Sequence, residues 1–133
     1  MIVRPDHVYV IPPNVNMALA KGGLFELSPR GETHNPHLPI DFFFRSLAEE
    51  RQSQAIGVVL SGTGSDGSLG LSEIKAAGGI TFAQDEKSAQ YSAMPLNAID
   101  SSRIDFILSP EEIACELARI GQHPGLKTAA GSE

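Results

Sequence analysis

Apolar residues are concentrated in short runs that predict the strands of a sheet. Residues 55–60 and 80–83 form nearly continuous apolar runs without alternation, which is typical of strands covered on both faces in a parallel sheet. A shorter run at 105–108 predicts a third strand of this kind. Residues 7–11 are rich in β-branched and aromatic side chains and stop at a Pro-Pro pair, so we expect a strand there as well.

Two further segments predict a hairpin, and a change of period predicts the first helix. Residues 16–20 and 24–27 flank the Gly22-Gly23 pair, whose freedom to adopt positive φ favours a tight turn. Farther along, apolar residues recur at the helical spacing i, i+3, i+4 and i+7, so we expect a helix that begins at Pro39 and ends near Arg51. Its apolar stripe consists of Ile40, Phe43, Phe44 and Leu47.

Two more helices have recognisable ends. One follows residue 67 and stops at the Gly78-Gly79 pair, where a left-handed residue can end a helix. The other begins at Ser109, with proline at its first position and Glu112 in place to complete a capping box. The buried stripes predicted for these helices are Leu71, Ile74 and Ala77, and then Ile113, Leu117 and Ile120.

The alternation of strands and helices predicts an α/β fold. We expect a three-layer sandwich with a doubly wound, largely parallel sheet and an added β-hairpin, in which chemistry gathers at the carboxyl ends of the strands. We expect residues 1–121 to form one domain. Residues 122–133 lack hydrophobic periodicity, so a flexible tail or linker is predicted there.

Composition narrows the classes of partner. At 133 residues and 41% hydrophobic, the chain is long enough for one core, and its net charge of −6 disfavours nucleic acid or anionic lipid as a partner. No apolar run approaches the roughly 20 residues of a membrane helix, and no secretory signal is visible. The single Cys115, interpreted as a partly buried apolar residue, fits a reducing compartment, so a cytoplasmic protein without metal or cofactor is expected.

The loop directly after residues 55–60 carries the candidate chemistry. Gly62-x-Gly64-x-x-Gly67 matches the fingerprint of a dinucleotide-binding loop, with Asp85 about 20 residues farther on. Against this reading, the carboxylate of Asp66 within the loop would repel a pyrophosphate at the helix N-terminus. Asp66 could instead cap the helix that follows, or act as a catalytic carboxylate. The local pattern leaves these three readings open.

Five segments in order give the chain a wider resemblance. They are residues 7–13, 37–46, 58–67, 82–86 and 94–95. Their order and spacing resemble the chemotaxis methylesterase (CheB) family over about residues 6–120. The residues of the first two segments most resemble the members that are fused to a chemotaxis methyltransferase. The resemblance implies a Rossmann-like methylesterase domain that hydrolyses glutamate methyl esters on chemoreceptors during chemotaxis signal transduction and phosphorelay, with deamidation of receptor glutamines as a second activity.

The resemblance also implies roles for particular residues. Asp66 matches the aspartate of the family's Ser-His-Asp triad, which holds the histidine in the useful tautomer. Backbone N–H groups near Thr63 would stabilise the oxyanion. Gly62, Gly64 and Met94 would complete the active-site loops. Many members have methionine in place of Thr63 and glycine in place of Ala93, departures that affect only fine site geometry.

The triad's other two members are missing from this sequence. In the family the serine lies in a Gly-Ala-Ser-x-Gly-Gly turn upstream, and the histidine follows; neither motif is present. We therefore expect an N-terminally truncated domain that is inactive alone, belongs to a larger chemotaxis protein and forms a homo-oligomer. A non-catalytic interaction domain is the alternative. His34 and His37 are interpreted as solvated loop residues, because no third metal ligand lies near them in the sequence, and His7 and His123 as surface residues that flank predicted elements.

Overall fold

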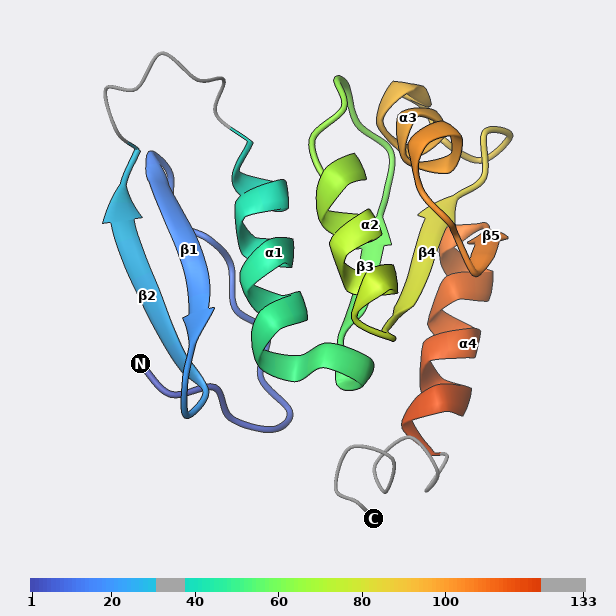
Figure 1. Ribbon diagram of the computed structural model, residues 1–133. Helices are drawn as coiled ribbons and strands as arrows, with labels where there is room; N and C mark the ends of the chain where they lie inside the picture. Colours follow the sequence, from blue (N-terminus) through green and yellow to red (C-terminus); the bar gives the residue numbers. More distant parts are fainter. Residues whose placement is uncertain (31–37, 123–133) are drawn as a thin grey trace.

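The chain forms a β-hairpin followed by alternating helices and strands (Figure 1). The computed structural model describes residues 1–30 and 38–122. The strands are β1 (Val15–Ala20), β2 (Leu24–Pro29), β3 (Ile56–Val59), β4 (Ile80–Gln84) and β5 (Phe106–Leu108). The helices are α1 (Pro39–Arg51), α2 (Ser68–Ala76), α3 (Ala93–Ser101) and α4 (Pro110–Gly121), with a short 3-10 turn at Gln52–Gln54.

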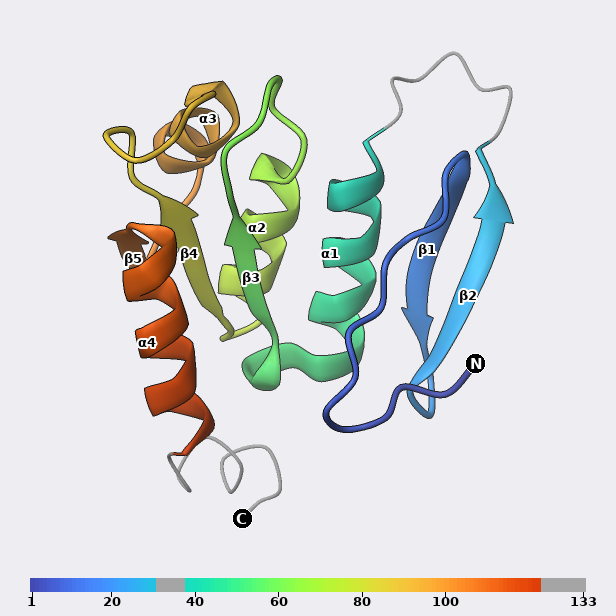
Figure 2. The same cartoon turned by 180° about the vertical axis from the view of Figure 1, so that it is seen from behind.

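Strands β3, β4 and β5 form a parallel sheet in that order. The central strand β4 is covered on both faces, and its residues Thr81, Phe82 and Ala83 have no exposed surface. Helices α2 and α3 lie on one face and α4 on the other, as the two opposite views show (Figures 1 and 2). This arrangement confirms the predicted three-layer α/β fold with a parallel sheet.

Each face of the sheet has its own apolar core. The core on the α1, α2 and α3 side is built from Ala48, Ala55, Val59, Leu71, Ile74 and Ala98. The core on the α4 side is built from Phe82, Ile113 and Ile120, with Phe106 stacked on Phe82 at a centroid distance of 4.9 Å. The apolar stripes predicted for α2 and α4 therefore face the sheet. The predicted capping box of α4 is also present, because Ser109 Oγ accepts from the Glu112 N–H while the Glu112 carboxylate accepts from the Ser109 N–H.

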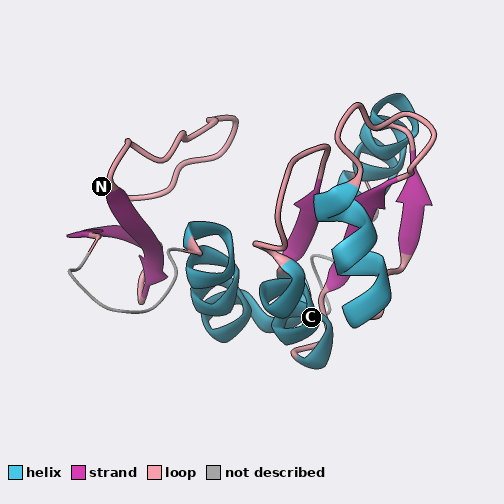
Figure 3. Cartoon of the chain, turned by 90° about the horizontal axis from the view of Figure 1, so that it is seen from above, coloured by secondary structure: helices cyan, strands magenta, loops and turns pink. Residues whose placement is uncertain are grey.

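The hairpin packs on α1 and not on the sheet. Viewed from above, α1 lies between the hairpin and α2 (Figure 3). The Leu19 N–H of β1 donates to Ser46 Oγ of α1 over 2.9 Å. Gly22 and Gly23 have φ values of 79° and 74°, which confirms their predicted role in the turn.

Residues 7–11 do not form the predicted strand. The segment runs alongside the hairpin without a partner strand among the described residues. Its residues favour extended structure, but without a partner they do not form the hydrogen bonds of a sheet. Tyr9 turns inward and meets Phe25 edge-on at 4.8 Å, whereas Val8 and Val10 are 93% and 83% exposed.

Two other features differ from the sequence-based expectations. Helix α3 was not predicted, since its nine residues include Pro95 in the first turn and no clear apolar stripe. Cys115 is exposed and not partly buried. It lies two residues beyond Ile113, a rotation of about 200° around the helix, which turns it away from the face that packs on the sheet. None of the described helices is long and apolar enough to cross a membrane.

A polar contact ties α2 to the start of β5. Asp105 Oδ1 accepts from Lys75 Nζ at 2.7 Å, and Asp105 Oδ2 accepts from the Thr81 N–H at 2.9 Å. Burial opposes the negative charge of Asp105, but the bonds from Lys75 and Thr81 together outweigh it and hold the pKa of this carboxyl below its ordinary value of 3.8.

We expect Asp105→Asn to lower the free energy of unfolding by about 1 kcal/mol at pH 7. A lowered folded-state pKa stabilises the protein above the unfolded pKa, and this contribution is lost as the pH falls through the folded value. The difference between wild type and variant should therefore shrink below about pH 4. Urea unfolding at several pH values measures it, with Glu26→Gln on the exposed hairpin as the control. A gap of constant size across this range would contradict the prediction.

Candidate functional site

The candidate loop lies at the carboxyl edge of the sheet. Strand β3 ends at Val59 and α2 begins at Ser68, so Asp66 lies in the turn between them, as predicted (upper edge in Figure 1). The N-termini of α1 and α2 lie at the same edge of the molecule (Figure 1). The carboxyl ends of parallel strands are where open α/β sheets form binding sites.

The first half of the loop is held against the start of α3. The Gly62 N–H donates to the Tyr91 carbonyl over 2.9 Å, and the Met94 N–H donates to the Gly62 carbonyl over 3.1 Å. A Cβ placed on Gly62 would lie 3.1 Å from Met94 Sδ, so a larger side chain would require the Met94 side chain to shift. Asn97 Nδ2 donates to the Gly64 carbonyl over 3.0 Å. The structure thus brings together the predicted site residues Gly62, Gly64 and Met94.

Gln84 is a buried anchor that the sequence analysis missed. It is the last residue of β4 and 5% exposed. Its Oε1 accepts from the Ser61 N–H at 2.8 Å, and its Nε2 donates to Ser88 Oγ at 3.1 Å. The side-chain amide therefore joins the loops that follow β3 and β4. A polar residue at the end of an otherwise apolar strand was the signal that could have identified it.

The carboxylate of Asp66 caps α1. Its Oδ2 accepts from the Ile40 N–H and its Oδ1 from the Asp41 N–H, both at 2.9 Å. The interpretation of Asp66 as a cap for the helix that follows it is therefore wrong, because the helix it caps begins 27 residues earlier, at Pro39. Unpaired N–H groups in the first turn of α1 and the positive end of its dipole both favour a carboxylate here.

Asp41 makes the reciprocal contact. Its Oδ1 accepts from the Gly67 N–H at 3.0 Å and from the Gly70 N–H at 2.7 Å, which caps α2. Asp41 is only 4% exposed, and this burial raises the pKa of its carboxyl, a shift that the bonds from Gly70 and Gly67 oppose and the charge of Asp66 reinforces. The sequence analysis missed this residue too, although an acidic residue in the first turn of an apolar helix was a detectable signal.

The paired caps leave little for a dinucleotide to bind. A pyrophosphate held by the glycine-rich loop would need the N–H groups at the start of α2. Those of Gly67 and Gly70 already donate to Asp41. The glycine pattern therefore matches the fingerprint, but the structure does not favour the dinucleotide-binding alternative.

Asp66 retains capacity for a further partner. An ionised carboxylate offers about four lone-pair positions, of which the two N–H groups of α1 use one on each oxygen. Asp66 is also only partly buried. Thr63 is exposed, and its backbone N–H makes no hydrogen bond with residues 1–30 or 38–122. His7 is exposed, whereas His34, His37 and His123 lie outside the described residues.

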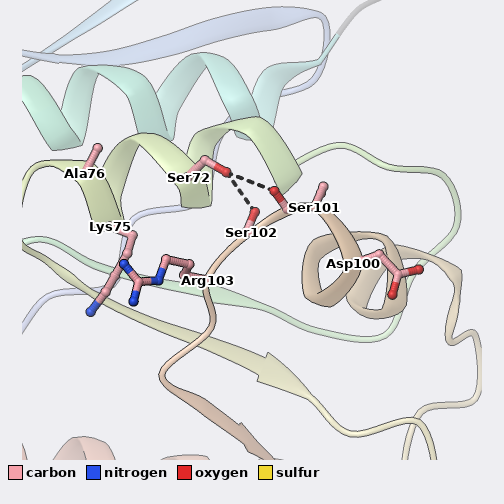
Figure 4. Close-up of a pocket in the computed structure, with 7 residues that line it drawn as sticks. All are labelled: Ser72, Lys75, Ala76, Asp100, Ser101, Ser102 and Arg103. Carbon is pink, nitrogen blue, oxygen red and sulfur yellow. Dashed lines mark hydrogen bonds between the residues drawn. The ribbon is translucent and has the colours of Figure 1, made fainter.

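A cavity of about 540 Å³ lies between α2 and the segment joining α3 to β5 (Figure 4). No residue of the loop at 61–67 lines it. Its serine hydroxyls satisfy one another and nearby carbonyls: Ser72 Oγ is 3.0 Å from Ser102 Oγ, which itself donates to the Ser68 carbonyl over 2.7 Å. Within residues 1–30 and 38–122 no histidine lines the cavity, and Lys75, which does, is paired with Asp105, so the described residues present no activated nucleophile there.

Comparison with known proteins connects this geometry to one family. The family model described as CheB methylesterase matches residues 1–117. A putative protein-glutamate methylesterase/protein-glutamine glutaminase of Leptospira interrogans is 38% identical, covering 91% of this chain and 63% of the relative. An uncharacterised 104.1 kDa protein of Rhodobacter capsulatus is 40% identical, covering 99% of this chain but 14% of the relative.

A solved structure gives the same result. The CheB methylesterase catalytic domain of Thermotoga maritima superimposes with a TM-score of 0.76 and 29% sequence identity. The match covers 84% of this chain and 61% of that structure. The chain thus spans less than two thirds of the length of these relatives.

We expect Gly67→Ala to lower the free energy of unfolding by roughly 2–4 kcal/mol. Gly67 has a φ of +99°, and an added Cβ would lie 3.0 Å from a Val59 methyl group and 3.2 Å from one of Ile40. Gly64→Ala has a similar φ but open space, so it should cost only about 1 kcal/mol. Gly121→Ala, with neither constraint, is the control. Equal urea midpoints for the Gly67 and Gly64 variants would contradict this account.

Proposed function

The chain belongs to the CheB methylesterase family, and we propose that it supplies the acidic residue, Asp66, of a Ser-His-Asp site that hydrolyses glutamate methyl esters on chemoreceptors. The observation that carries the proposal is the anchored carboxylate at the carboxyl edge of the sheet. Two backbone N–H groups orient it, and each oxygen keeps a lone pair for an incoming imidazole N–H.

The chemistry follows from the roles in such a triad. Asp66 orients the histidine so that its other ring nitrogen takes the serine proton, while the serine oxygen attacks the ester carbonyl. The histidine then protonates the departing methanol, and water hydrolyses the acyl-enzyme to release glutamate. Attack on a receptor glutamine follows the same course and releases ammonia. Asp66 stays ionised throughout and stabilises the imidazolium that forms.

The glycine turn is proposed to stabilise the negative charge on the reacting oxygen. The N–H of Thr63, which has no hydrogen-bond partner among the described residues, is the candidate oxyanion donor, and Gly62 and Gly64 allow the turn that presents it. Met94 holds this turn against α3 through its bond to the Gly62 carbonyl. Gln84 fixes the residue before the turn, Ser61, by accepting its backbone N–H.

We propose that the serine and histidine come from sequence upstream of these residues. The chain lacks the serine motif and spans 61% of the Thermotoga catalytic domain and 63% of the Leptospira relative. A non-catalytic interaction domain is the alternative that this absence favours. A serine motif in the coding sequence that precedes Met1 would decide for the enzyme, and its absence would decide for the alternative.

We place the protein in the cytoplasm as part of a larger chemotaxis protein, with a methyltransferase domain as the expected neighbour. The support is the length of the Rhodobacter relative, of which this chain covers 14%, and the resemblance to fused versions. Chemoreceptors are the proposed protein substrates. The net charge of −6 continues to disfavour nucleic acid as a partner.

The activity test compares the chain with the full-length product of its gene. We expect no detectable methanol release from methylated receptor by this chain alone, because the nucleophile and base are missing. The full-length product should be active, and Asp66→Asn should lower its turnover by up to about 10⁴-fold because an amide favours the wrong histidine tautomer.

The folding control for this test is essential. In Asp66→Asn, the amide nitrogen replaces an oxygen that accepts a backbone N–H, so stability should also fall by about 1–2 kcal/mol. Turnover is therefore expressed per folded molecule, with circular dichroism as the measure. A folded variant with undiminished turnover would remove Asp66 from the mechanism.

We also propose that the isolated chain associates with itself through its open strand edge. Within residues 1–30 and 38–122, β3 pairs with β4 alone, so its other edge has unpaired backbone groups. Leu60, the residue directly after β3, is 47% exposed and adds apolar surface at the end of this strand. Such edges favour pairing with a second copy.

Light scattering tests the self-association. The wild-type chain should be dimeric or larger at high micromolar concentration, and Leu60→Lys, directly after β3, should shift it toward monomer because a charge at this strand opposes edge pairing. Glu26→Lys on the exposed hairpin strand is the control for the added charge. A monomeric wild-type chain at this concentration would overturn the proposal.

A further inference from the structure

We infer that Asp41 is a positioning residue for the catalytic carboxylate of Asp66. This inference rests on the proposed function, since it assigns Asp41 a role in the same site. Asp41 belongs to α1, whereas Asp66 precedes α2, so the two residues come from separate parts of the chain.

Asp41 holds Asp66 at two points. Its backbone N–H donates to Asp66 Oδ1 over 2.9 Å, which orients the carboxylate. Its side-chain Oδ1 accepts from the N–H of Gly67, the next residue after Asp66, over 3.0 Å. The same oxygen accepts from the Gly70 N–H over 2.7 Å, which anchors the turn to the first turn of α2. Both the side chain of Asp66 and the backbone beside it therefore depend on Asp41.

The close packing of α1 and α2 makes these hydrogen bonds possible. A Cβ on Gly70 would lie 2.5 Å from Phe44 Cβ and 3.2 Å from Asp41 Cα, so only glycine lets α1 and α2 approach this closely. At this separation the short side chain of aspartate spans the gap. With 4% of its surface exposed, Asp41 is shielded from water that could replace its hydrogen bonds.

Loss of the Asp41 carboxylate frees the turn that carries Asp66. The Gly67 and Gly70 N–H groups then lack their acceptor, and the backbone at Asp66 can rotate. A displacement of about 1 Å in a catalytic group costs on the order of 10²-fold in rate. The effect should fall on turnover and not on substrate binding, because Asp41 is buried beneath the loop.

The test measures kcat and KM for methanol release by the full-length gene product. We expect Asp41→Ala to lower kcat per folded molecule by roughly 10- to 100-fold with KM within about twofold. Asp41→Asn should keep kcat within about threefold, because both bonds go to Oδ1, which the amide oxygen reproduces. Glu73→Gln, an exposed acid on α2, is the matched control and should leave both constants unchanged.

The outcomes separate this inference from the proposed function. Undiminished turnover in folded Asp66→Asn would overturn the proposed function itself. If Asp66→Asn is inactive but folded Asp41→Ala keeps the wild-type kcat, or if Asp41→Asn loses as much kcat as alanine, the positioning role is wrong.

A second variant covers the case in which Asp41→Ala does not fold. Asp41→Glu keeps the charge but moves the oxygens by one methylene, so kcat per folded molecule should fall by at least about tenfold. An unchanged kcat in this variant would show that charge alone matters and would overturn the inference.

Discussion

The exchange of caps between α1 and α2 is the interaction on which the arrangement of the site depends. Asp66, just before α2, accepts from the first turn of α1, and Asp41, in the first turn of α1, accepts from the start of α2. Each carboxylate satisfies N–H groups that a helix start would otherwise leave unpaired. Neither helix can shift along its axis without breaking bonds at the other, so their N-termini stay together at one edge of the molecule.

Glycines make this exchange possible by removing side chains where backbones must approach. Gly70 lies where α1 crosses α2, and Gly57 of β3 lies beneath Leu71 and Ile74 of α2, where an added Cβ would come within 2.6 Å of the Leu71 side chain. Gly67 adopts the positive φ that turns the chain from the loop into the helix. The glycine pattern thus serves close packing and a tight turn, and the carboxylates occupy the N–H groups that a dinucleotide would use.

The position of the site also explains why a partly exposed loop can hold a carboxylate so firmly. Gln84 binds the loop from the end of β4, Met94 and Asn97 bind it from α3, and Asp41 binds it from α1. The anchors therefore come from three different elements around the loop. The triad role proposed for Asp66 needs such support, because a catalytic carboxylate acts through a fixed orientation toward its partner.

Much of this protein followed from local pattern in the sequence. Periodicity and end signals predicted the hairpin, α1, α2, α4 and the three parallel strands, since these depend on which face of a segment is apolar and on capping residues within a few positions. The local strand-loop-helix pattern placed Asp66 in the turn after β3, and the wider resemblance supplied its proposed role. The strand expected at residues 7–11 was wrong, because propensity does not supply a partner strand. The partial burial expected of Cys115 was also wrong, because it was inferred from residue type and not from the position of Cys115 off the predicted apolar stripe of its helix.

Only the tertiary structure decided that Asp66 caps a helix starting 27 residues earlier, that Asp41 caps α2 in return, and that Gln84 joins two loops. The two caps and the bond between Gln84 and Ser61 link residues 23 to 29 positions apart, and they depend on the packing of whole helices and strands, which no local pattern encodes.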